Sequence, residues 1–125
     1  MFLNLSHTRL DVFQRSREFV LECYKISKNM PPDERYAMTQ QIRRAALSVH
    51  LNIVEGCSRK SPVERNRFME IDRGSLIEVD AAIDIAVALN YSALEDLTTL
   101  GITMNRAFAC ISGMISANQR NENRH

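Results

Sequence analysis

The sequence contains no tryptophan, and only four glycines and three prolines occur among its 125 residues. A β-fold needs many tight turns, which are rich in glycine and proline, so this composition favours helices. No apolar run approaches the roughly 20 residues of a membrane span. The first residues also lack the basic start and apolar stretch of a signal peptide. We therefore expect a single-domain cytoplasmic protein without a membrane partner.

Three cysteines, Cys23, Cys57 and Cys110, are odd in number and widely spaced among apolar residues. This spacing indicates neither a disulfide framework nor a zinc site. We interpret them as small core-type residues in a reducing compartment.

Charge is balanced overall but unevenly distributed. The net charge of +1 disfavours a strongly cationic surface over the whole molecule. Residues 35–73 contain eight Arg or Lys and four Asp or Glu, whereas residues 74–105 contain five acids and no Arg or Lys. The folded chain is therefore expected to have a basic half and an acidic half.

Helical periodicity predicts four helices, at about residues 8–28, 32–58, 62–90 and 93–117. The Pro31-Pro32 pair should separate the first two, because proline suits a first helical turn but not a helix interior. Ser61-Pro62-Val63-Glu64 is a capping box that starts the third helix, and Ser92-Ala93-Leu94-Glu95 repeats the pattern before the fourth.

Short connections force consecutive helices to lie antiparallel. The sequence therefore predicts an all-α, up-down-up-down antiparallel four-helix bundle. Residues 1–7 are expected to form an N-terminal arm, residues 8–117 the bundle and residues 118–125 a polar, frayed tail.

Spacing along three of the helices predicts which residues face the core. In the first helix they are Val12, Phe13, Ser16, Phe19, Val20, Cys23 and Tyr24. In the third they are Phe68, Ile71, Val79, Ala82, Ala86 and Leu89. In the fourth they are Leu94, Leu97, Gly101, Met104, Phe108, Ile111 and Ile115.

The second helix carries two apolar arcs. The first arc contains Ile42, Ala46, Val49 and Ile53. The second contains Leu47, Leu51 and Val54, and a polar stripe holds Gln41, Arg44, Ser48, Asn52, Glu55 and Arg59. A monomeric bundle needs only one arc, so the second is either an exposed patch or, as we favour, a contact with a neighbouring subunit. Gly74 and Gly101, inside helices, permit either close backbone approach or relief of crowding within the bundle.

These residues resemble a known family. The matching segments are 41–49 (Gln-Ile-Arg-Arg-Ala-Ala-Leu-Ser-Val), 52–56 (Asn-Ile-Val-Glu-Gly), Ser58-Arg59, Ser61, Glu64, Phe68, Gly74-Ser75-Leu76, Ile85-Ala86, Leu89 and Tyr91. Together they are similar to the four-helix-bundle proteins encoded in intervening sequences of bacterial 23S ribosomal RNA genes.

The resemblance implies a four-helix bundle that assembles into a ring-like homopentamer. The family is also similar in fold to accessory proteins of diversity-generating retroelements, which form pentameric barrels and bind nucleic acid. No enzymatic activity is implied, and neither a cofactor nor a small-molecule substrate is expected.

Six cations around the motif form a candidate nucleic-acid surface, namely Arg43, Arg44, Arg59, Lys60, Arg65 and Arg67. Such a basic rim on the second and third helices could contact RNA or DNA phosphates. Alternatively, cations of this region pair with the acids Glu55, Glu64, Glu70 and Glu78 within and between helices. We favour the second interpretation.

Candidate oligomer-interface or polar-network residues are Leu47, Leu51, Val54, Asn52, Glu55 and Gly56. Glu55 is disfavoured as a catalytic acid, because an acid beside arginine remains ionised. We identify no metal ligands: the one Glu-x-x-His pattern, Glu122 to His125, lies in the expected tail, and His50 is interpreted as a core or interface residue.

Overall fold

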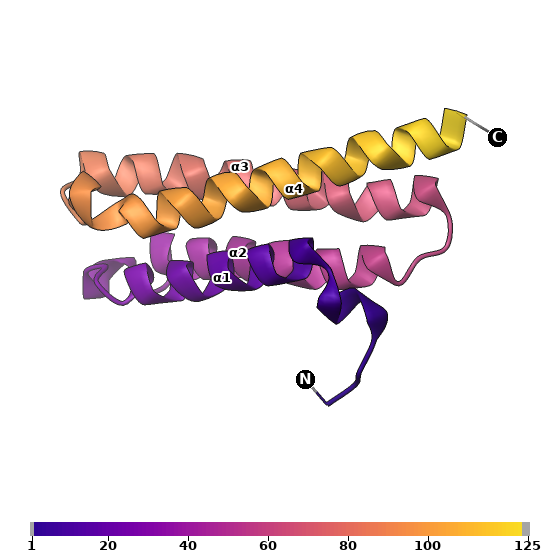
Figure 1. Ribbon diagram of the computed structural model, residues 1–125. Helices are drawn as coiled ribbons and strands as arrows, with labels where there is room; N and C mark the ends of the chain where they lie inside the picture. The colour runs from indigo at the N-terminus through magenta and orange to yellow at the C-terminus, as the bar shows by residue number, and fades with distance from the viewer. Residues whose placement is uncertain (1, 124–125) are drawn as a thin grey trace.

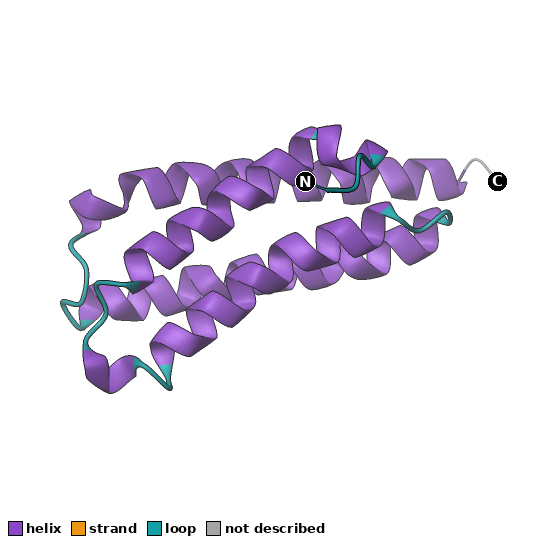
Figure 2. Ribbon diagram, turned by 90° about the horizontal axis from the view of Figure 1, so that it is seen from below, coloured by secondary structure: helices purple, strands orange, loops and turns teal. Residues whose placement is uncertain are grey.

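The computed structural model describes residues 2–123, apart from the side chains at positions 8, 9, 122 and 123. Its four long helices are α1 (Asp11–Ser27), α2 (Met38–Cys57), α3 (Pro62–Ala88) and α4 (Thr98–Asn123). Three short 3₁₀ helices, η1 (Ser6–Arg9), η2 (Pro32–Glu34) and η3 (Leu94–Leu97), precede α1, α2 and α4. The described residues contain no strand (Figure 2), so the predicted all-α fold is confirmed.

The helices run alternately up and down (Figure 1), as the short connections predicted. Each packs against its neighbours in sequence, and α1 also packs against α4, which closes a four-sided bundle. The α1–α2 and α3–α4 turns therefore lie at one end of the bundle, and the α2–α3 turn lies at the other.

The core contains one apolar seam from each helix. The expected core arc of α2 is confirmed, with Ala46 and Val49 fully buried. The seam of α1 is confirmed in part: Phe19 and Cys23 are fully buried, whereas Phe13 and Tyr24 are half-buried. Ser16 is also buried, and its hydroxyl donates to the carbonyl of Phe13 at 3.0 Å. A polar residue is tolerated there because its hydrogen bond is made locally.

Side chains and turn conformations define several helix ends. Ser61 Oγ accepts a hydrogen bond from the Glu64 amide at 3.4 Å, which confirms Ser61 as the N-cap of α3. The α3–α4 turn places Asn90 at φ 63°, a left-handed conformation that asparagine tolerates well. The Tyr91 amide then donates back to the Ala86 carbonyl at 2.9 Å and completes the end of α3.

Two predicted helix starts are wrong. The segment from Pro32 forms only a single 3₁₀ turn, and α2 begins at Met38, whose amide donates to a Glu34 carboxylate oxygen at 3.1 Å. The second capping box is not formed, because Ala93 occupies the N-cap position of η3 and no side chain caps it. The helical region after Ser92 therefore starts as a 3₁₀ turn, and α4 begins at Thr98.

The end of α4 also differs from the prediction. The helix continues to Asn123 instead of fraying after residue 117. Asn118 is buried and its side-chain amide donates to Asn66 Oδ1 of α3 at 2.7 Å, while Asn66 donates to the Ile115 carbonyl at 3.3 Å. These polar contacts, which apolar periodicity cannot reveal, hold the last turns against α3.

The predicted core faces of α3 and α4 are partly wrong. Val79 and Ala86 are buried, but Ile71 and Leu89 are exposed and Phe68 is half-buried. The inward residues of α3 are Met69, Asp72, Leu76, Val79, Ile83 and Ala86. In η3 and α4, Leu97, Ile111 and Ile115 are buried as expected, whereas Leu94 and Phe108 are exposed. Leu100, Thr103 and Ala107 complete the seam of α4.

Helices α2 and α3 approach each other closely at Gly56, a glycine for which the sequence analysis did not predict close packing. A Cβ atom added at Gly56 would lie 2.9 Å from Phe68 Cβ and 2.8 Å from Met69 Cε. By contrast, an added Cβ at Gly74 or Gly101 would meet nothing within 4 Å. Within one chain, therefore, only Gly56 of these three glycines is required by packing.

We predict opposite effects of alanine at two helical glycines. Gly56→Ala should lower the free energy of unfolding by about 1–3 kcal/mol, because the new methyl group overlaps α3. Gly113→Ala in α4, where an added Cβ meets nothing within 4 Å, should raise it by up to about 1 kcal/mol through helix propensity. Urea unfolding followed by circular dichroism measures both; a more stable Gly56→Ala variant would contradict the packing.

Candidate interaction surfaces

The six candidate nucleic-acid residues do not form one rim. Arg43 and Arg44 lie in the second turn of α2, whereas Arg59, Lys60, Arg65 and Arg67 surround the α2–α3 turn at the other end of the bundle. At about 1.5 Å per residue, the length of α2 separates the two groups by roughly 20 Å. Each group is therefore a surface of its own.

Two cations at the α2–α3 turn stabilise the turn itself. Arg59 pairs with Glu55 at 2.6 Å and lies over the Phe68 ring, 5.2 Å from its centroid. Arg65 donates to the carbonyls of Arg59 and Lys60 at 3.1 and 2.7 Å. The Arg59–Glu55 pair supports the ion-pair interpretation, whereas Arg65 binds backbone carbonyls of the turn. Lys60 and Arg67 are exposed.

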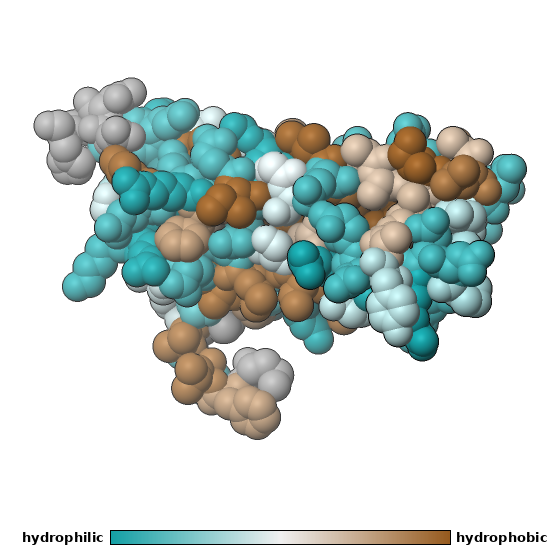
Figure 3. Space-filling model, turned by 180° about the vertical axis from the view of Figure 1, so that it is seen from behind, coloured by the Kyte–Doolittle hydropathy of each residue, from teal (hydrophilic) through white to brown (hydrophobic). Residues whose placement is uncertain are grey.

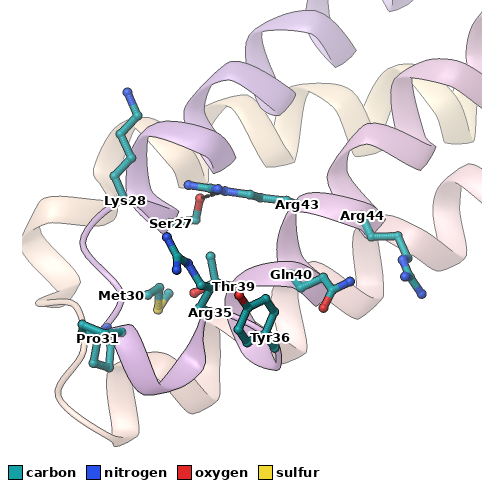
Figure 4. A pocket seen from close by; sticks show the side chains of 11 residues that line it. Ser27, Lys28, Met30, Pro31, Arg35, Tyr36, Thr39, Gln40, Arg43 and Arg44 are labelled. Atoms are coloured by element: carbon teal, nitrogen blue, oxygen red, sulfur yellow. Dashed lines mark hydrogen bonds between the residues drawn. The ribbon is translucent and has the colours of Figure 1, made fainter.

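The other group belongs to an open pocket of about 810 Å³ between the end of α1 and the start of α2 (Figure 4). Its lining residues are Ser27, Lys28, Met30, Pro31, Pro32, Arg35, Tyr36, Thr39, Gln40, Arg43 and Arg44. Four of these are cations, and the described lining contains no Asp or Glu. The pocket is therefore a concave, positively charged surface.

Arg43 is held in place within this pocket. Its Nε donates to Ser27 Oγ at 2.7 Å, and its guanidinium lies 5.2 Å from the centroid of the Tyr24 ring. Ser27 is buried and donates in turn to the Tyr24 carbonyl at 3.0 Å. The sequence did not identify Lys28, Arg35 or Tyr36 as part of this site.

The second apolar arc of α2 lies on the bundle surface. Leu47 and Leu51 are exposed and Val54 is half-buried, whereas the first arc is buried in the core. Figure 3 views the face formed by α2 and α3, where apolar atoms make an interrupted band among polar ones. Nothing in the single chain covers this band.

The outward face of α3 contributes to the same surface. Ile71, Ile77 and Ile85 are each about half exposed, at 51, 56 and 49 %. Gly74 and Ala81 lie between them at helical spacing and are exposed too. Because its inward seam is also apolar, α3 has apolar residues on opposite faces, a pattern typical of a helix buried on both sides.

The polar residues proposed as one network make separate contacts. Asn52 donates to the Ser48 carbonyl and hydroxyl, both at 2.9 Å, and Ser75 of α3 donates to the Ser48 hydroxyl at 3.4 Å. Glu55 instead pairs with Arg59, four residues later. Thus Ser48, to which Asn52 donates, makes the polar contact with α3, and Glu55 supports the turn.

His50 and Ser16 join α2 to α1. Ser16 Oγ and His50 Nδ1 are 2.7 Å apart, and the imidazole packs against Phe13 with ring centroids 4.7 Å apart. Burial, together with the charges of Arg17 and His7, lowers the pKa of His50. The pair therefore links the buried Ser16 of α1 to α2.

All three thiols have raised pKa values. Cys23, Cys57 and Cys110 are free, and burial raises the pKa of each, for Cys23 to about 12 with a contribution from Glu22. A raised pKa keeps a thiol protonated and weakens it as a nucleophile.

Asp72 is the unusual titratable residue of the core. It is fully buried in the inward seam of α3, and neither carboxylate oxygen has a hydrogen-bond partner. Burial raises its pKa to about 9, so the side chain is a neutral carboxylic acid at pH 7. With no exposed surface it contacts no substrate, and its consequence is for stability.

The described residues contain neither a metal-binding cluster nor a membrane-spanning helix. No group of three or more His, Cys, Asp or Glu is placed to hold a metal ion. No described helix is long and apolar enough to cross a membrane. The Glu122 and His125 side chains of the one Glu-x-x-His pattern lie outside the described part of the chain.

Fold and surfaces together define an antiparallel four-helix-bundle protein with an uncovered apolar face on α2 and α3 and a basic pocket at one end. The family model of the 23S rRNA-intervening sequence protein matches residues 8–113, which is most of the chain. The protein therefore belongs to this family, as the residues of α2 and α3 indicated. Comparison with curated proteins gave no match.

We predict that Asp72 makes stability fall as pH rises. The folded state keeps the proton up to pH about 9, whereas the unfolded chain releases it near pH 3.8. Between these values the unfolded state binds fewer protons than the folded state. The free energy of unfolding therefore falls by up to about 1.4 kcal/mol for each unit by which the pH rises. Asp72→Asn should remove this slope. Compared with the parent protein at the same pH, the variant should therefore fare better at pH 8 than at pH 5.

Urea unfolding at several pH values measures this dependence. The matched control is Asp84→Asn, which changes an exposed carboxyl group on the same helix and should leave the slope intact. Equal slopes in the parent protein and Asp72→Asn would show that the buried carboxyl is not protonated.

Proposed function

We propose that this protein is a non-enzymatic structural and interaction module that assembles into a ring-like homo-oligomer. The observation that carries the proposal is the apolar band formed by Leu47 and Leu51 of α2 with Ile71, Ile77 and Ile85 of α3. Groups of exposed apolar residues on one face mark interaction sites on many proteins. A second copy of the chain is the occupant that the remaining evidence favours, and the family resemblance supports five copies.

Charge distribution supports contact between copies. Residues 35–73 contain eight Arg or Lys and four Asp or Glu, whereas Glu78, Asp80 and Asp84 make the later part of α3 acidic. Two different surfaces of opposite charge favour a head-to-tail contact, and such contacts close into rings when the rotation between subunits permits. Gly74, where an added Cβ meets nothing within 4 Å, leaves room for a neighbouring chain at the centre of the outward face of α3.

The first test compares one substitution at two equally exposed leucines. Leu51 of α2 is 55 % exposed and Leu21 of α1 is 54 % exposed, but only Leu51 lies in the apolar band. Leu51→Asp places a charge in the proposed interface and should reduce the particle to a single chain of 14.3 kDa. Leu21→Asp should leave the parent oligomer intact. Light scattering behind a sizing column measures the mass, with circular dichroism as a check on folding.

Several outcomes would contradict the proposal. A parent protein of 14.3 kDa would remove the assembly argument. An oligomer that survives both Leu47→Asp and Leu51→Asp would place the contact elsewhere, and equal dissociation by Leu21→Asp would show that the effect is not specific to α2.

Nucleic-acid binding is the second candidate function, and the specific observation that favours it is the basic pocket at the start of α2. Phosphate contacts release counterions, so affinity for RNA or DNA should fall steeply with salt. We expect binding of a short structured RNA to weaken by at least about tenfold between about 50 and 200 mM salt. Fluorescence anisotropy measures it, and absence of binding at the lower salt concentration would reject this function.

A further inference from the structure

We propose that the basic pocket binds one nucleotide unit of single-stranded nucleic acid, with the phosphate between Arg35 and Arg43 and the base on the ring of Tyr36. This inference rests on the nucleic-acid-binding candidate and assigns it a site and a form of ligand. It also replaces the six-residue rim by a site that includes three residues outside that rim, Lys28, Arg35 and Tyr36.

The charge in the pocket calls for an anion. Lys28, Arg35, Arg43 and Arg44 line it, and no described acid lies among them. Glu34, which directly precedes Arg35, is engaged elsewhere. One of its carboxylate oxygens accepts from the Met38 amide at 3.1 Å and the other accepts from the Tyr91 hydroxyl at 3.2 Å. An anion entering the pocket would therefore meet four cations and no competing carboxylate of the lining.

Two guanidinium groups converge on one place. Figure 4 shows Arg35 and Arg43 extending toward each other beside Ser27, while Lys28 and Arg44 extend from the edges of the pocket. The hydrogen bond from Arg43 to Ser27 and the contact with Tyr24 fix one of the two groups in advance. A phosphate accepts hydrogen bonds from planar guanidinium groups, which suits this pair.

An aromatic ring lies beside these cations. Tyr36 is 82 % exposed, a high value for a large amphipathic side chain, and the Arg35 guanidinium is 5.9 Å from its ring centroid. The ring is open to stacking by a base, and the exposed amide of Gln40 lines the same pocket. Cations with a free aromatic ring are the combination that proteins use to hold single strands.

The same combination favours a single strand over a duplex. Bases in a duplex are stacked on each other, so a side chain outside the helix cannot stack on them. An acidic peptide would satisfy the arginines but would make no use of the exposed ring. A nucleotide unit with an unstacked base is the ligand that occupies both parts of the pocket.

The test measures binding of a fluorescein-labelled single-stranded RNA of about 12 nucleotides, a length within the usual range of single-strand sites. Tyr36→Ala should weaken binding about tenfold or more through loss of stacking, and Tyr36→Phe should retain the parent affinity. Arg35→Gln should weaken binding and reduce the slope of log affinity against log salt by about 0.7. Arg35 and Tyr36 are exposed, so these variants should fold normally.

The matched control removes the same type of charge at the other end of the bundle. Lys60→Gln and Arg67→Gln change exposed cations beyond the pocket and should leave the affinity nearly unchanged. If RNA binds but only these control variants weaken it, nucleic-acid binding stands and the pocket assignment fails. If the parent protein does not bind RNA at about 50 mM salt, both fail.

Competitors identify the form of ligand. Unlabelled single-stranded RNA should displace the probe, whereas a duplex of the same sequence, adenosine monophosphate and polyglutamate should compete poorly. Equal competition by the duplex, or equal affinity of Tyr36→Ala and Tyr36→Phe, would overturn the stacking role. Equal competition by the free nucleotide or by polyglutamate would overturn the assignment of a nucleic-acid strand.

Discussion

The apolar residues on opposite faces of α3 constrain this structure more than any other feature. The inward seam, with Met69, Leu76 and Val79, fixes α3 between α2 and α4, and Gly56 lets α2 approach closely enough to cover it. The bundle is then closed, and the outward isoleucines of α3 remain uncovered beside Leu47 and Leu51. The proposed assembly follows from this geometry, because the packing that completes the monomer leaves a second apolar face to be buried.

Periodicity identified the core where one face of a helix is clearly more apolar than the rest. This is the case in α1, where Phe19 and Cys23 are buried as predicted. It is not the case in α3, where the expected Ile71 and Leu89 belong to the outside and Asp72 to the inside. A helical-wheel projection does not tell which of two apolar faces points to the core. A buried acid also opposes the usual rule that charged residues lie outside. The spacing of Met69, Asp72 and Leu76, in steps of three and four, was nevertheless the signal that could have placed Asp72 in the core.

The candidate sites depend on turns, where periodicity has least to say. The sequence-based prediction placed Arg44 and Arg59 in one basic rim because both are near the family motif. They lie at opposite ends of α2, so the helix keeps them far apart. It passed over Arg35 and Tyr36, which lie between η2 and α2 and acquire their position from the non-helical turn after Pro32. The signal that could have indicated this site was a tyrosine next to an arginine in the polar segment between two helices. Ser61 caps α3 as the sequence predicted. The similar pattern at Ser92 does not cap a helix, because the backbone after Ser92 first forms a 3₁₀ turn.

Self-assembly and strand binding would reinforce each other in this molecule. A chain with a net charge of +1 cannot bind a polyanion strongly through its overall field, so a single pocket should bind a strand weakly. In a ring of identical chains the pocket would recur at the same height around the axis, because the rotation that relates the chains carries each pocket onto the next. A strand held by one pocket is then presented to the next at a high effective concentration, and several weak contacts combine into a stable one. On this argument the apolar band on α2 and α3 contributes to binding without touching the ligand, by setting the number and spacing of the pockets.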